Sequence, residues 1–68
     1  MNHTARLDTL TKRAARVRSN LQDAERRHRM CQYPAVAEAI ALDCETLAQQ
    51  LFWIEDEYDN LLFQSRWH

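Results

Sequence analysis

The sequence of 68 residues contains no glycine and a single proline, Pro34, at its midpoint. Glycine is the usual residue where the backbone needs positive φ, so its absence leaves few tight turns available. Proline suits the first turn of a helix, where its missing N–H group costs nothing. The sequence therefore predicts an all-α chain with two long uninterrupted segments and a restart at Pro34.

Apolar and small residues recur on both sides of Pro34 in alternating steps of three and four, the a/d pattern of a coiled coil. The first series is Leu7, Leu10, Ala14, Val17, Leu21, Ala24, His28 and Cys31, and the second is Ala37, Ile40, Cys44, Leu47, Leu51, Ile54, Tyr58 and Leu61. We expect a single domain over residues 1–68, with helices over about 4–31 and 34–65 and a turn over about 32–34. The two helices should form an antiparallel, coiled-coil-like hairpin.

A connection this short joins antiparallel neighbours, and this fixes a register. Placing Cys31 opposite Ala37 makes the numbers of facing residues add up to 68. On one flank of the seam the register predicts the pairs Arg6–Gln64, Arg13–Glu57, Asn20–Gln50 and Arg27–Asp43, and on the other Thr4–Leu62, Thr11–Glu55, Arg18–Ala48 and Glu25–Ala41. The charges support the same pairing of halves, because residues 1–32 carry +5 and residues 33–68 carry −6.

The second helix holds more apolar side chains than one hairpin can cover. Ala41, Ala48, Phe52 and Leu62 form a stripe beside the seam that predicts self-association into a four-helix bundle. A chain of this length buries only about 60% of its unfolded surface, so help from a second copy or a partner is expected.

The remaining aromatic residues predict contact with another protein, because aromatic side chains are frequent anchors at interfaces. The expected partner-binding residues are Phe52, Trp53, Asp56, Asn60, Leu62, Phe63 and Trp67, with Asp56 and Asn60 supplying polar specificity. The leading hypothesis is a non-enzymatic module that sequesters, escorts or inhibits another protein.

An alternative hypothesis is an RNA- or DNA-binding regulator that uses the first helix. Lys12, Arg16, Arg26 and Arg29 point away from the seam, where they could meet phosphates. The balance of the whole chain, at −1, and the acidic second helix weigh against this interpretation.

Chemical sites are not indicated. His28, Cys31 and Cys44 are too few and wrongly spaced for the usual zinc signatures, and Cys31 and Cys44 fall in different layers, so neither a metal nor an intrachain disulfide is expected. The acidic run from Glu55 to Asp59 spreads round a helix instead of converging, so catalysis and cofactors are not expected either.

No apolar run approaches the ~20 residues of a membrane span, and the start of the chain lacks a secretory h-region. We therefore expect a cytoplasmic protein with no membrane contact and with reduced cysteines.

In size and hairpin layout the chain resembles three groups of small proteins. One is the repressor-of-primer type, which dimerises into a four-helix bundle and binds paired RNA loops. Another is the two-helix co-chaperone of type III secretion needle subunits, which it resembles in its apolar second helix. Small phage- or plasmid-encoded inhibitors are the third. No motif carries these resemblances, so they assign no residue roles.

Overall fold

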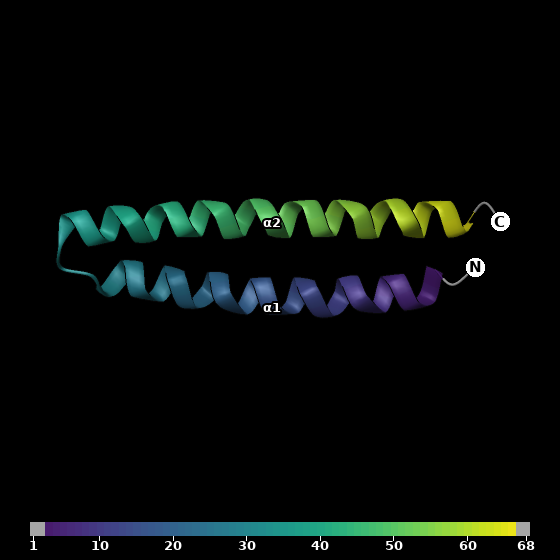
Figure 1. Ribbon diagram of the computed structural model, residues 1–68, viewed down its shortest axis with the longest axis horizontal. Helices are drawn as coiled ribbons and strands as arrows, with labels where there is room; N and C mark the ends of the chain where they lie inside the picture. The colour runs from purple at the N-terminus through teal and green to yellow at the C-terminus, as the bar shows by residue number, and fades with distance from the viewer. Residues whose placement is uncertain (1–2, 67–68) are drawn as a thin grey trace.

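The computed structural model describes residues 3–66 as two long helices. Helix α1 spans His3–Met30 and helix α2 spans Pro34–Arg66. They lie side by side and antiparallel, so the start of α1 and the end of α2 share one end of the molecule (Figure 1). The described part of the chain contains no strand, and the expected all-α hairpin is confirmed.

The connection between the helices consists of Cys31, Gln32 and Tyr33. The amide of Cys31 donates to the carbonyl of His28 at 3.3 Å, which tightens the last turn of α1. At the other side, the amide of Ala37 donates to the carbonyl of Tyr33 at 2.8 Å and closes the first turn of α2. The sequence predicted that Cys31 would be the last residue of the first helix. Because α1 ends at Met30, Cys31 lies in the turn instead.

Both helices contain threonines, which have weak helix propensity, and the structure shows how they are accommodated. The hydroxyls of Thr9, Thr11 and Thr46 each donate to the backbone carbonyl four residues earlier, at 2.9 to 3.1 Å. These bonds satisfy the hydroxyl groups within their own helix. The threonines therefore need no partner on the other helix.

The buried cluster lies in the half of the hairpin away from the turn, while Ala24, nearer the turn, is buried apart from it. Leu10, Ala14 and Ile54 form a buried cluster, and Leu10 is 0% exposed. Val17, Leu51, Tyr58 and Leu61 pack against this cluster while remaining partly exposed. Every one of these residues belongs to the predicted seam, so the hydrophobic repeat identified the face that each helix turns toward the other.

Most of the seam is incompletely covered. Of its sixteen residues, four are buried, eleven are partly exposed, and His28 is exposed. His28 occupies a seam position without being covered there, and it borders a depression that Ala41 and Cys44 of α2 also line. It lies in the last turn of α1 with Arg27 and Arg29, whose guanidinium groups suit the negative end of the helix dipole. Two helices alone do not enclose the apolar surface that this repeat supplies.

Neither helix, over the residues that the structure describes, combines the length and the apolar character needed to span a membrane.

Candidate functional site: the two flanks of helix α2

Two ion pairs join the helices on opposite flanks of the buried cluster. Arg6 donates to the Glu57 carboxylate on one flank, and Arg18 Nη2 lies 3.2 Å from Glu55 Oε2 on the other. The predicted partners were Arg13 for Glu57 and Thr11 for Glu55. The ion pair expected between Arg13 and Glu57 is therefore wrong, although these two residues line the same depression. Thr11 and Glu55 line one groove, as the register expects, but the Glu55 carboxylate pairs with Arg18. Each arginine reaches a carboxylate seven residues, or about two helical turns, from the residue that it was expected to face, Gln64 for Arg6 and Ala48 for Arg18.

The ion pairs still agree with the predicted register. The residue numbers of Arg6 and Glu57 add up to 63, and those of Arg18 and Glu55 add up to 73, which lie equally far on either side of 68. One arginine therefore reaches toward the turn and the other away from it, and both converge on the level of the core. All four side chains are about half exposed, so these pairs favour the register more than they stabilise the fold.

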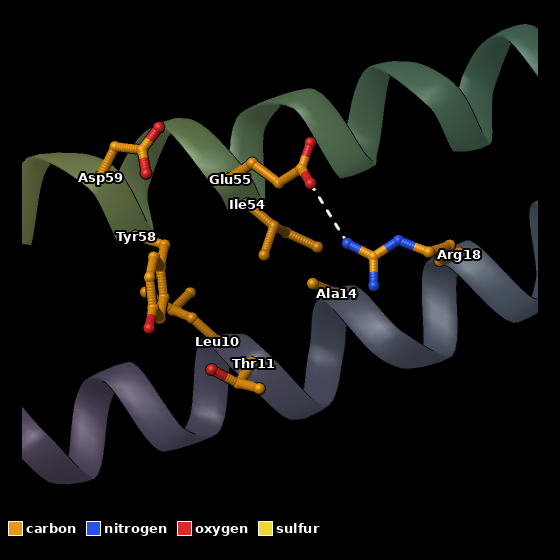
Figure 2. A pocket seen from close by; sticks show the side chains of 8 residues that line it. All are labelled: Leu10, Thr11, Ala14, Arg18, Ile54, Glu55, Tyr58 and Asp59. Carbon is orange, nitrogen blue, oxygen red and sulfur yellow. Dashed lines mark hydrogen bonds and ion pairs between the residues drawn. The ribbon is translucent and has the colours of Figure 1, made fainter.

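An open groove of about 480 Å³ lies along the flank that carries Arg18 and Glu55. Figure 2 shows Leu10, Ala14, Ile54 and Tyr58 between the helices, with polar side chains around them. The polar lining consists of Thr11, Arg18, Glu55 and Asp59. The groove therefore has an apolar base that belongs to the core and a rim that carries both signs of charge.

Beside this groove lies a surface that we call the Phe52 face, made of Ala41, Ala48, Phe52 and Leu62. Phe52 is 66% exposed and Leu62 is 37% exposed, while Ala41 is partly buried. Phe52 lies three residues before Glu55 and four after Ala48, so helical spacing places these residues on one side of α2. The Phe52 face and the groove thus form one continuous surface on one flank of the hairpin.

A second surface, the Trp53 face, consists of Trp53, Asp56, Asn60 and Phe63. These residues follow spacings of three and four along α2, and all four are exposed, Trp53 by 59% and Phe63 by 62%. Trp53 lines a shallow depression with Arg13, Gln50 and Glu57, on the flank opposite to the groove. Trp67, the last aromatic residue of the predicted set, lies outside the described residues.

The expected partner-binding residues therefore do not form one surface. Phe52 and Trp53 are adjacent in sequence but about 100° apart round the helix, and they face opposite flanks. Phe63 lies near the back of α2, away from α1. The sequence prediction placed Phe52 both in the self-association stripe and, with Trp53, in the partner-binding set, whereas helical spacing assigns the two residues to faces with different neighbours.

Several exposed apolar residues were not among the site residues predicted from the sequence. Met30 and Tyr33 lie at the turn, and Val36 and Leu42 follow in the first part of α2. Their positions outside the a/d repeat are the signal that would have found them. Leu42 borders a depression together with Ala41 of the Phe52 face, whereas Met30, Tyr33 and Val36 lie at or near the turn. Tyr33 and Leu42 provide matched controls for experiments on binding and on stability, respectively.

The basic residues of the alternative hypothesis lie on the outer side of α1. Lys12 forms an ion pair with Asp8 at 3.1 Å, one turn earlier in the same helix. Arg16, Arg26 and Arg29 are exposed and form no ion pair within residues 3–66. Three arginines are thus open to solvent along about four turns of helix.

The cysteines show no metal or disulfide chemistry. Cys31 and Cys44 are free and partly buried, and the Cys31 thiol donates to the carbonyl of Tyr33 at 3.4 Å. Within the described range, no three His, Cys, Asp or Glu residues lie together in a way that could hold a metal ion.

Comparisons of this chain with protein-family models, with curated proteins and with solved structures find no match.

Proposed function

We propose that this protein is a non-enzymatic binding module that dimerises through the Phe52 face and sequesters, escorts or inhibits another protein through the Trp53 face. The observation that carries the proposal is the exposure of Phe52, Trp53 and Phe63 on a helix whose inner side already packs against α1. Large apolar patches of this kind on small soluble proteins are typical of interaction surfaces.

Incomplete burial of the seam supports the dimer. Leu21, Ile40 and Leu47, in the half of the hairpin near the turn, all remain partly exposed. Two hairpins packed as a four-helix bundle would remove more of this apolar surface from water, which is the usual way that such hairpins gain stability.

The composition of the Trp53 face supports a protein ligand. Trp53 and Phe63 are large side chains with few rotatable bonds, so they lose little conformational entropy when a partner covers them. Asp56 and Asn60 lie between them. The Asp56 carboxylate can accept hydrogen bonds, and the Asn60 side-chain amide can both donate and accept them. Partners with a shallow apolar pocket and nearby donor groups fit this pattern. The two free thiols are compatible with a reducing, cytoplasmic location.

The test is affinity purification of the tagged chain from its native cells, with Trp53→Ala and Phe63→Ala beside the wild type. The copurified protein is then identified, purified and titrated against each variant. We expect each substitution to weaken binding by tenfold or more, as is common for aromatic anchors. Tyr33→Ala, which removes an equally exposed aromatic residue at the turn, should leave binding unchanged. Equal binding by all four proteins would contradict the proposed surface.

A second candidate function is nucleic acid binding, favoured by the exposed and unpaired Arg16, Arg26 and Arg29 within the described part of α1. If this function is correct, an RNA hairpin or a DNA duplex should bind with steep salt dependence, and an Arg16/Arg26/Arg29→Ala triple variant should lose that binding. If the leading proposal is correct, neither probe binds measurably at 50 mM salt. The experiment therefore separates the two functions directly.

A further inference from the structure

The Phe52 face and the adjacent groove make a single long surface on one side of the hairpin. It contains the exposed Phe52, the partly exposed Leu62 and a groove whose apolar base is the core. The hairpin has extents of 53 × 14 × 13 Å, so one whole side of it projects only about 700 Å². Stable interfaces bury about 800 Å² of accessible surface on each partner, so a specific contact would occupy most of this side of the hairpin.

A second copy of this chain can cover that surface in two symmetric ways. A two-fold axis along the hairpin puts both turns at the same end and places α1 on α2 of the partner. A two-fold axis across the hairpin puts the turns at opposite ends and places each helix on its own counterpart. In both cases all adjacent helices run antiparallel, so the helix dipoles do not favour either arrangement.

The charges distinguish the two arrangements. Helix α1 carries +5 and helix α2 carries −6 over their described lengths. Pairing each helix with its own counterpart about an axis near the middle of the hairpin would bring Glu45 of one α2 close to Glu55 of the other, and Glu55 close to Glu45. Like-charge contacts such as these are strongly disfavoured at interfaces. Pairing α1 with the partner's α2 instead brings together helices of opposite net charge.

We propose that two copies pack with their turns at the same end, and that Phe52 of each copy covers the groove of the other. This inference rests on the dimerisation proposed above and adds its geometry. Because facing residues of one hairpin have numbers that add up to 68, Phe52 stands level with the segment near Ala15 and Arg18. In the same-end arrangement the partner copy presents its phenyl ring at this level over α1, beside the groove lining that runs from Leu10 to Arg18.

The contact is reciprocal, as a two-fold interface requires. Ala14 and Ala15 leave room for the ring on α1, and the Arg18 side chain can lie along it while keeping its contact with Glu55. The charged side chains on the groove rim, Arg18, Glu55 and Asp59, would then surround the apolar contact that the phenyl ring makes.

A distance measurement tests the arrangement. A nitroxide label is attached at Gln32→Cys in a Cys31→Ser/Cys44→Ser background, and the separation between the two labels in the dimer is measured by pulsed electron resonance. Turns at the same end give a distance below about 30 Å, because a four-helix bundle is about two helix diameters wide. Turns at opposite ends give more than about 40 Å, since the hairpin is 53 Å long.

The matched control is a label at Gln49→Cys, in the same background. Gln49 is exposed and lies near the middle of the hairpin, so its label pair is close in both arrangements and reports that the labelled protein still forms dimers. Circular dichroism checks that the background variant keeps its helices.

The outcomes separate this inference from the proposed dimerisation. Short distances at both positions support the same-end arrangement. A short distance at Gln49 with a long one at Gln32 overturns the arrangement and leaves dimerisation intact. A monomeric mass for the wild type across the accessible concentrations overturns both. Replacing Phe52 with alanine should reduce dimer affinity by tenfold or more, and an unchanged affinity would overturn the assigned contact.

Discussion

Leu10 is the side chain on which the fold depends most. It is fully buried in a cluster that contains only two other buried residues, Ala14 and Ile54. Truncating a buried leucine costs about 2–5 kcal/mol through lost transfer energy and the cavity left behind. A core of this size supplies only roughly 3–5 kcal/mol, so one such truncation is comparable with the whole stability.

Leu10→Ala should therefore leave the chain largely unfolded at 25 °C. Urea denaturation followed by circular dichroism, at one fixed protein concentration, measures the loss. Leu42→Ala removes the same atoms from a residue that is 62% exposed and should change stability by less than about 0.5 kcal/mol. Similar losses for the two variants would show that the core lies elsewhere.

Glu57 forms its ion pair with Arg6 and not with Arg13, and this gives a second prediction for single residues. A double-mutant cycle between Arg6 and Glu57 should show a coupling of about 0.2–1 kcal/mol, because the pair is half exposed, and the coupling should shrink in 1 M salt. The cycle between Arg13 and Glu57 should show none. A larger coupling for Arg13 would restore the pair expected from the sequence.

At the scale of the helices, register matters more than any single pair. Ile54, Tyr58 and Leu61 reach the seam only because they lie on one side of α2. A single residue inserted before them rotates the rest of the helix by about 100° and turns all three away from α1. The same insertion in the turn lengthens a loop and rotates nothing.

An alanine inserted between Gln49 and Gln50 should therefore lower the thermal midpoint sharply or abolish cooperative unfolding. An alanine inserted between Gln32 and Tyr33 should lower it by a few degrees at most, since lengthening a loop costs little. Thermal melts followed at 222 nm make the comparison. Equal melts would mean that the helices do not depend on this seam.

The sequence predicts the features that depend on the repeating a/d pattern better than those that depend on single side chains. The hairpin and its inner faces follow from a repeat that runs through both helices, so a single uncovered position such as His28 does not disturb them. The partners of Arg6 and Arg18 could not be predicted, because a long arginine side chain can reach a carboxylate about two helical turns from the residue that it directly faces. The separation of Phe52 from Trp53 follows from helical spacing, which already placed Phe52 in the stripe with Ala41, Ala48 and Leu62, although the partner-binding set contained both aromatic residues.

At the scale of the whole molecule, the central claim is that the two faces of α2 have different roles. In this proposal the Phe52 face, which continues into the groove, would bind a second copy, and the Trp53 face, on the other flank, would bind another protein. Opposite charges on α1 and α2 hold the hairpin in register and, in the dimer, favour contact between unlike helices. The proposed function thus rests on exposed apolar side chains of α2, among them Phe52 and Trp53.

The most direct test of this claim is the mass in solution of three proteins, measured by light scattering across a range of concentrations. The wild type should approach twice the chain mass of 8.1 kDa, Phe52→Ala/Leu62→Ala should remain close to the mass of one chain, and Trp53→Ala/Phe63→Ala should dimerise like the wild type. A wild type that stays monomeric, or a loss of dimer in both double variants alike, would contradict the division of α2 into two faces.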